Sequence, residues 1–203
     1  MSSDKKIPCN IIPTQFLSMD KLAKEWDAIV LTENEEIVKN ALKIIVPEFE
    51  SLTFIDAIDG STMRGRRRLA KVKISGVPRP VPLNSLGDGM LRTLQLVLNV
   101  FSAKDGFLLI DEFENGLHYS VQEKIWGLLF ELANNLNVQI FATTHSWDCI
   151  ESFTKVAANK TGVDGVLFRL GKSIRASEKG RIIATVFDKQ QLLNITQSDV
   201  EVR

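Results

Sequence analysis

Asp111 and Glu112 follow an apolar run in FLLIDE, residues 107–112. A carboxylate at the end of a buried strand can hold Mg²⁺, and a second carboxylate beside it can activate the water that attacks a γ-phosphate. The pair therefore predicts a centre for phosphoryl transfer. A strand that simply ends in a solvated acidic turn would give the same residues.

A second apolar run, in residues 138–146, ends in Thr143, Thr144 and His145. If both runs are strands of one parallel sheet, their carboxyl ends meet, and these polar residues lie near Asp111. A histidine there can contact the γ-phosphate and sense whether it is present. A single histidine at a strand end is more often structural, but its pairing with FLLIDE favours the functional interpretation.

Glycines and a serine open a third stretch, LNSLGDGM, before a long apolar helix. The residues concerned are Ser85, Gly87, Asp88 and Gly89. The free N–H groups and the positive end of a helix attract anions, and the hydroxyl of Ser85 adds a donor. The stretch predicts an anion site, although a glycine-rich turn that only caps the helix would read the same.

The elements that must position these residues alternate between strand and helix from residue 83 onward. This order is typical of an α/β fold with a mostly parallel sheet flanked by helices. The strands are expected at residues 107–112 and 138–145, and the helices at residues 90–101, 121–132 and 147–159. The tail predicts a C-terminal β-hairpin over residues 166–187, with a closing helix near residues 190–193.

The N-terminal part predicts a helical hairpin within residues 1–50. Ser18 can cap a first helix, and Thr32 with Glu35 forms the capping-box pattern that opens a second one. Pro47 then ends the second helix.

Residues 51–82, between the helical hairpin and the three motifs, are predicted to form strands and a loop rather than helices. We expect strands at residues 52–58 and 68–74 and a proline-rich loop at residues 76–82. Together with the flanking parts, this segment is predicted to belong to a single domain of residues 1–203.

Composition narrows the class of protein. Lys plus Arg equals Asp plus Glu, at 25 each, so the formal net charge is zero and argues neither for nor against nucleic acid. The two cysteines, Cys9 and Cys149, form no CxxC pattern and indicate no disulfide framework. No apolar run approaches the roughly 20 residues that span a bilayer. We therefore expect a cytoplasmic protein without a membrane segment.

Together the three stretches resemble the motifs of ABC-type ATPases, in particular the RecF-like and OLD-like branch of the AAA family. Ser85-Leu86-Gly87-Asp88 is similar to the signature motif, FLLIDE to Walker B, FENGLH (residues 113–118) to the D-loop and TTHS (residues 143–146) to the H-loop. Tyr119 stands where that branch carries a proline.

This resemblance implies a partial P-loop NTPase fold with ATP and Mg²⁺ as cofactors. It implies that Asp111 holds Mg²⁺, that Glu112 is the catalytic base and that His145 contacts the γ-phosphate. The signature residues would bind the γ-phosphate of an ATP held by an opposing protomer; they are Ser85, Gly87, Asp88 and Gly89. A homodimer or a partner chain is therefore implied.

The family also implies a phosphate-binding loop (Walker A, GxxxxGKS/T) before the signature, and residues 1–82 contain none. The single GKS, residues 171–173, has Val166 where the pattern needs glycine, and we expect it to be a hairpin turn. We also expect FLLIDE to lose its neighbour in the sheet. A partner chain, a second copy or a rearranged N-terminal strand would have to cover that edge.

Two functions follow from this pattern. The chain is predicted to be the C-terminal half of a RecF/OLD-like ATPase, which binds ATP poorly until another chain supplies the Walker A half, or which lost that half by truncation. The alternative is a non-catalytic assembly or regulatory subunit. The basic run Arg64–Lys73 could contact nucleic acid phosphates, but it has no aromatic residues interleaved, and a solvated hairpin face is the favoured interpretation.

Overall fold

The computed structural model describes residues 6–57, 68–160, 165–173 and 180–197 of the chain. The chain divides into two compact units, Met1–Thr144 and His145–Arg203. The single domain expected from the sequence stays a prediction.

A parallel sheet of three strands forms the centre of the first unit. Its order is β1 (Cys9–Ile12), β5 (Phe107–Ile110) and β6 (Gln139–Ala142), and both pairings are parallel. The FLLIDE strand therefore has a neighbour on each side, and the expectation that it loses one is wrong. The N-terminal strand β1 covers that edge, which was one of the three alternatives.

Strand β1 lies in the segment that the sequence assigned to the helical hairpin. It has four residues between Pro8 and Pro13, too few to show an alternating pattern. The pairing brings the carbonyl of Pro8 close to residue 106, and the N–H of Phe107 donates to that carbonyl at 2.9 Å. Glycine at position 106 leaves room for this approach. A Cβ at position 106 would collide with that carbonyl.

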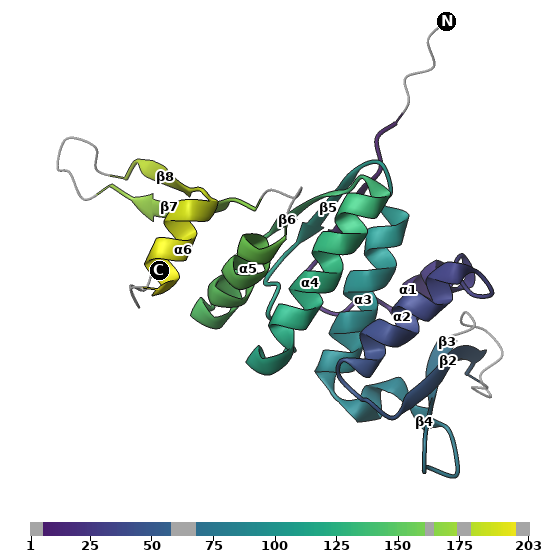
Figure 1. The fold of residues 1–203 in the computed structure, drawn as a ribbon. Helices are drawn as coiled ribbons and strands as arrows, with labels where there is room; N and C mark the ends of the chain where they lie inside the picture. Colours follow the sequence, from purple (N-terminus) through teal and green to yellow (C-terminus); the bar gives the residue numbers. More distant parts are fainter. Residues whose placement is uncertain (1–5, 58–67, 161–164, 174–179, 198–203) are drawn as a thin grey trace, which may run out of the picture. The chain divides into compact units, whose positions relative to one another are not determined.

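Two helices cover one face of this sheet (Figure 1). They are α3 (Asp88–Ser102) and α4 (Tyr119–Leu136), and their predicted positions are confirmed with longer bounds. Every side chain of α3 from Met90 to Val100 is buried, because the helix packs against α1, α2, α4 and β1. This burial makes α3 the core helix of the unit.

The helical hairpin and an antiparallel sheet complete the first unit. The helices are α1 (Met19–Asp27) and α2 (Glu33–Lys43), and the sheet has the order β2 (Phe49–Asp56), β3 (Arg68–Ile74), β4 (Val81–Pro82). Strand β4 corrects the predicted proline-rich loop, because its two residues pair with the middle of β3. Among the described strands, parallel pairing is confined to β1, β5 and β6, so the sheet structure is less parallel than expected.

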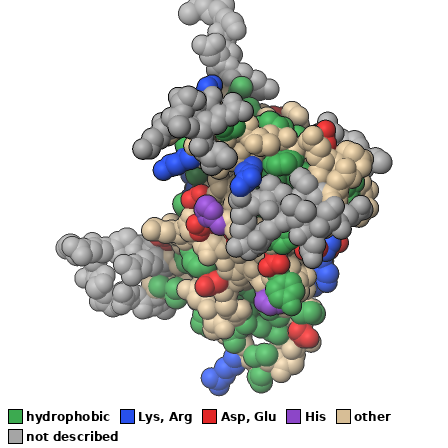
Figure 2. Space-filling model, turned by 90° about the vertical axis from the view of Figure 1, so that its left-hand side faces the viewer, with side chains coloured by type: hydrophobic (Ala, Val, Ile, Leu, Met, Phe, Trp, Pro, Cys, Tyr) green, Lys and Arg blue, Asp and Glu red, His purple; other side chains and the backbone are tan. Residues whose placement is uncertain are grey.

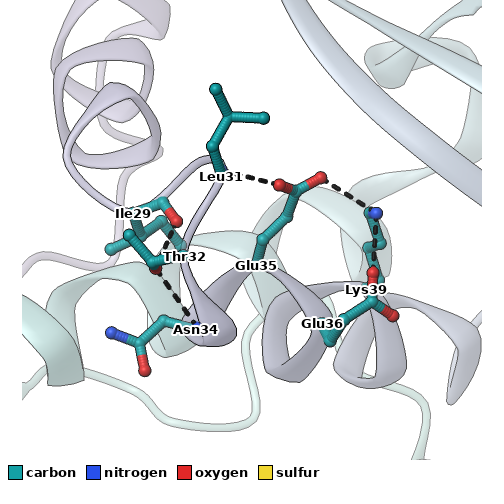
Figure 3. A network of polar contacts seen from close by, with 7 residues as sticks. All are labelled: Ile29, Leu31, Thr32, Asn34, Glu35, Glu36 and Lys39. Carbon is teal, nitrogen blue, oxygen red and sulfur yellow. Dashed lines mark hydrogen bonds and ion pairs between the residues drawn. The ribbon is translucent and has the colours of Figure 1, made fainter.

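The N-terminus of α2 shows how the predicted capping box forms (Figure 3). The hydroxyl of Thr32 accepts a hydrogen bond from the N–H of Asn34 at 3.3 Å. The carboxylate of Glu35 accepts from the N–H of Leu31 at 2.8 Å, one residue before the expected N–H, and pairs with Lys39 at 2.9 Å. One N–H of the first helical turn and one N–H just before the N-cap are thus bound.

Replacing Glu35 by glutamine is expected to lower the free energy of unfolding by about 1 kcal/mol at pH 7. Hydrogen bonds from Lys39 and the N–H of Leu31 lower the pKa of Glu35. Its carboxylate therefore stabilises the fold above the ordinary value of 4.5, and this contribution is lost as pH falls through the lower folded-state pKa. Urea unfolding of both proteins between pH 7 and pH 3 measures the difference, which should shrink in acid. The exposed Glu33→Gln is the control, and an equal loss in that variant would contradict the capping role.

The second unit contains two helices and a hairpin. They are α5 (Trp147–Asn159), β7 (Leu167–Lys172), β8 (Ile182–Phe187) and α6 (Lys189–Gln197). The predicted helices and the antiparallel hairpin are confirmed, and Ser146 caps α5 by accepting from the N–H of Cys149 at 3.4 Å. No helix in the described part of the chain is long and apolar enough to cross a membrane.

The first two residues of the GKS triplet end strand β7 of this hairpin, and Ser173 follows the strand directly. Gly171 and Lys172 pair with Ile183 and Ile182, and Ser173 donates its N–H to the carbonyl of Arg181 at 2.8 Å. The predicted hairpin turn is therefore corrected to paired strand. A strand of an antiparallel hairpin also lacks the strand-to-helix loop geometry of a phosphate-binding loop.

Candidate functional site

Asp111 lies where the strands of the parallel sheet end, and two threonines hold its carboxylate. The hydroxyl of Thr14, just beyond β1, donates to one oxygen at 2.7 Å. The hydroxyl of Thr143, just beyond β6, donates to the other at 2.8 Å. The prediction that the ends of the two apolar runs lie close together is therefore confirmed for Asp111 and Thr143.

Sequence reasoning missed Thr14, because it did not recognise β1 as a strand. The available signal was the position of this threonine directly after the apolar pair Ile11–Ile12 and Pro13. It is the same arrangement of an apolar run and a polar residue that marked Asp111 and Thr143. Three strands, rather than two, deliver the polar groups of this site.

Glu112 stands in a sharp turn immediately after Asp111. Its φ is +47°, in the left-handed region that residues other than glycine seldom adopt. Three hydrogen bonds donated by backbone N–H groups fix the turn. The N–H of Glu112 donates to the side-chain hydroxyl of Thr143 at 2.9 Å, that of Phe113 to the carbonyl of Thr143 at 3.0 Å, and that of Asn115 to the carbonyl of Glu112 at 3.0 Å. Such a strained conformation persists only when the surrounding contacts hold it in place. The side chain of Glu112 is half-exposed.

The guanidinium of Arg92 binds the backbone carbonyls of this turn from the buried side. Arg92 is fully buried on α3 and donates to the carbonyls of Pro13 at 3.1 Å, Asp111 at 2.8 Å and Glu112 at 2.7 Å. It thereby ties the end of β1 to the end of β5.

Burial lowers the pKa of Arg92, and the carboxylates of Glu114, Asp111 and Glu112 oppose that effect. A guanidinium stays charged in proteins, so a buried positive charge lies under the acidic turn. Sequence reasoning missed this residue as well. Its signal was that Arg92 is the one charged residue of the apolar stretch 90–101.

The loop after Glu112 packs closely on the start of α3. A Cβ on Gly116, whose φ is +77°, would lie 3.1 Å from the Cβ of Asp88, and a Cβ on Gly89 would lie 3.2 Å from the carbonyl oxygen of Gly116. Phe113 anchors the same loop by stacking on Trp126, with ring centroids 3.7 Å apart. The D-loop-like and signature-like stretches therefore lie side by side in one chain.

The signature-like residues face solvent. Ser85, Gly87 and Asp88 are exposed, and Gly89 is half-buried. Gly87 is the N-cap of α3 and supplies no side-chain cap. The hydroxyl of Ser85 donates to the carbonyl of Pro82 at 2.6 Å within a short 3₁₀ turn (η1, Leu83–Leu86), so donation to a phosphate requires this bond to open.

Tyr119 is the first residue of α4, at the position where the sequence resemblance led us to expect a proline. Proline is favoured at this position because its missing N–H has no partner within the helix. The ring nitrogen Nδ1 of His118, the N-cap, accepts from the N–H of Ser120 at 3.4 Å. The helix therefore starts properly without the proline.

His145 is exposed and begins the second unit. Its predicted place beside Asp111 stays a prediction. What the first unit contributes to the site is Asp111, Glu112 and the two threonines.

The oxygen-only set around Asp111 fits Mg²⁺ better than a softer metal. Mg²⁺ is usually held by one or two carboxylates together with substrate phosphates and water. Within the described residues, no group of three His, Cys, Asp or Glu side chains could hold a metal. A single carboxylate flanked by the hydroxyls of Thr14 and Thr143 fits a Mg²⁺ site in which substrate phosphates and water supply the remaining ligands.

The basic run Arg64–Lys73 lies partly outside the described residues, which begin again at Arg68. Arg68 pairs with Asp27 at 3.0 Å, and Lys73 pairs with Glu50 at 2.6 Å. These pairs favour a solvated hairpin face over a nucleic-acid surface. Figure 2 is drawn from the side away from β2 and β3, and it shows acidic and basic side chains of the described residues on that other face.

A family model and two proteins match the sequence. The model described as "AAA domain, putative AbiEii toxin, Type IV TA system" (AAA_21) matches residues 22–148, more than half of the 203-residue chain. An ATP/GTP phosphatase of Helicobacter pylori is 34% identical over 93 residues, which are 44% of this chain and 25% of that protein. An uncharacterized protein of Methanocaldococcus jannaschii is 38% identical over 82 residues, 40% of this chain and 71% of that protein. The match thus spans about a quarter of the Helicobacter relative.

Solved structures of SMC ATPase heads share the fold. One comes from work on the ATP-driven dimerization and DNA-stimulated activation of SMC ATPases; its TM-score is 0.51 at 13% identity, over 91% of this chain and 98% of that one. Another is an SMC head bound to the C-terminal winged-helix domain of ScpA, with a TM-score of 0.52 at 13% identity, over 80% of this chain and 44% of that one. At this identity the likeness shows the fold alone.

Proposed function

Because the chain belongs to the AAA-domain family whose model matches residues 22–148, we propose that it carries the signature, Walker B and H-loop motifs of a RecF/OLD-like ATPase. Its ATP site is completed by a phosphate-binding loop on another polypeptide segment. One arrangement supports this most strongly: the Asp111 carboxylate lies between two threonine hydroxyls where three parallel strands end. Open α/β sheets bind ligands at that end.

In this proposal the acidic turn supplies the catalytic groups. Mg²⁺, when bound, would neutralise charge on the phosphates. Asp111 would hold it, and Thr14 and Thr143 would keep the carboxylate oriented. Glu112 would accept a proton from the attacking water, and His145 would contact the γ-phosphate.

The start of α3 serves a second nucleotide in this proposal. Ser85, Gly87, Asp88 and Gly89 would bind the γ-phosphate of an ATP held by an opposing protomer, with the uncapped N–H groups of α3 as donors. The exposure of Ser85, Gly87 and Asp88 supports this role. Gly116 packs closely on Asp88. A shift of Asp88 on phosphate binding would therefore move the loop that follows Glu112. ATP-driven dimerization of the structurally similar SMC ATPases is consistent with it.

Binding of Mg-ATP tests the division of the site. The chain contains no GxxxxGKS/T pattern, so we expect weak binding by the chain alone in calorimetric titrations. Tight binding is expected after the chain is mixed with a polypeptide that supplies this pattern, for which the product of the neighbouring open reading frame is the first candidate to test. In the mixture, Asp111→Ala should weaken Mg-ATP binding, whereas the exposed Glu123→Gln on α4 should not. Tight binding by the chain alone would refute the divided site.

A further inference from the structure

Arg92 is a buried charged group to which the proposed reaction assigns no part. Its side chain is fully buried on α3. Burial of a charge is costly unless hydrogen bonds satisfy it, so a buried arginine needs a reason to be there. The hydrogen bonds of Arg92 go to the backbone carbonyls of Pro13, Asp111 and Glu112, two of which belong to the acidic turn.

The two carbonyls in the turn flank the Cα atom of Glu112. One guanidinium nitrogen of Arg92, Nη2, donates to the carbonyl of Asp111 at 2.8 Å and to that of Glu112 at 2.7 Å. Because each peptide group is planar, the directions of these two carbonyls define the φ and ψ angles of Glu112. Successive carbonyls of an extended strand point in opposite directions, so their convergence on one nitrogen needs the chain to turn at Glu112.

The direction of the Glu112 side chain depends on this turn. Its φ of +47° is unfavourable for a residue with a Cβ atom. Rotation about the N–Cα bond into the right-handed region would turn the Cα–Cβ bond and carry the carboxylate away. The carboxylate of Asp111 is held separately, by the hydroxyls of Thr14 and Thr143. Loss of Arg92 would therefore displace the carboxylate of Glu112 more than that of Asp111.

The third hydrogen bond of Arg92 reaches a segment that has a second support. Its Nη1 donates to the carbonyl of Pro13 at 3.1 Å. The side-chain amide of Asn115 donates to the carbonyl of the next residue, Thr14, at 2.7 Å. Thr14 thus keeps a contact with the acidic loop when Arg92 is changed, and the surroundings of Asp111 are preserved.

We propose that Arg92 is a positioning residue for the general base: it holds the turn in which the carboxylate of Glu112 faces the attacking water of the completed site. The inference rests on the proposed function and adds to it a residue outside the acidic turn. Arginine suits this task because its fork of N–H groups reaches three carbonyls at once. Lysine donates from a single nitrogen and cannot reproduce that geometry.

Arg92→Lys tests this role in the completed site. The single-turnover rate of ATP hydrolysis should fall about tenfold, because a small displacement of the base is costly. The affinity for Mg-ATP should stay unchanged, because the contacts of Asp111 remain. Gln95→Met is the matched control: Gln95 is fully buried on the same helix, and its amide has no hydrogen-bond partner within the described residues. A parent-like rate in Arg92→Lys, an equal loss in Gln95→Met, or a loss of affinity in place of rate would overturn the proposal.

A double-mutant cycle separates positioning from a general structural effect. If Arg92 acts through Glu112, Arg92→Lys should cause no further loss of rate in a chain that already carries Glu112→Gln. A tenfold loss in both backgrounds would show that Arg92 acts independently of the base and would overturn the proposal.

Hydrogen exchange of the chain alone examines the turn without nucleotide. The amides of Glu112 and Phe113 donate to Thr143 and should exchange faster in Arg92→Lys than in the parent or in Gln95→Met. Unchanged exchange would overturn the proposal. So would global unfolding of Arg92→Lys, seen by circular dichroism, because Arg92 would then hold the whole unit rather than the base.

The outcomes for Arg92 and for the proposed function are separable. If the parent mixture releases phosphate and Arg92→Lys releases it equally fast, the role of Arg92 is wrong and the ATPase proposal stands. If the parent mixture releases no phosphate, the ATPase proposal fails, and faster exchange at residues 112 and 113 in Arg92→Lys still supports the hold of Arg92 on the turn.

Discussion

Replacement of Glu112 by glutamine is expected to slow ATP hydrolysis by the completed site at least about 100-fold while ATP stays bound. The amide has nearly the shape of the carboxylate but cannot accept the proton of the attacking water. The turn that holds residue 112 is fixed by backbone contacts to Thr143 and by Arg92, none of which involves the carboxylate. The substitution should therefore remove the base without moving its surroundings.

The measurement is a single-turnover assay with labelled ATP, in which bound ATP and released phosphate are counted separately. Glu123→Gln makes the same chemical change on the exposed surface of α4 and should leave the rate unchanged. Parent-like hydrolysis by Glu112→Gln would show that another group is the base.

Gly106→Ala is expected to destabilise the chain by about 3 kcal/mol, a large effect for one methyl group. The added Cβ would lie 2.9 Å from the carbonyl carbon of Pro8 and even closer to its oxygen. Backbone atoms cannot give way as a flexible side chain can, so β1 would have to leave β5. Thr14 would then move away from Asp111, and the site would lose one of its holders.

Urea unfolding measures this loss, with Gly127→Ala as the matched control. Gly127 lies in α4, and nothing lies within 4 Å of a Cβ added there. Alanine is favoured over glycine in a helix interior by roughly 1 kcal/mol, so the control should be neutral or more stable. A Gly106→Ala protein as stable as its parent would show that β1 does not contribute to the sheet in solution.

The sequence predicted those parts of the fold that depend on long periodic patterns. The bounds of α5 match its apolar spacing, and α3 and α4 differ only at their ends. The polar ends of the two apolar runs indicated where the site lies, because carboxyl ends of parallel strands share one edge. The contact between Thr143 and Asp111 bears this out.

The missed features are short or depend on tertiary contacts. Strand β1 has four residues, and only its pairing with β5 distinguishes it from a loop. The role of Arg92 arises from carbonyl groups that lie 19 to 79 residues away in sequence. The edge expected to be bare was assigned from the family resemblance alone, and among the described strands the sheet order places β1 and β6, not β5, at the edges.

The release of phosphate from Mg-ATP tests the central claim most directly. The chain alone, a candidate polypeptide that carries GxxxxGKS/T alone, and their mixture are compared under identical conditions. Only the mixture should release phosphate, and the release should be lost when the chain carries Glu112→Gln. Equal phosphate release by the chain alone, or by the mixture with Glu112→Gln, would contradict it.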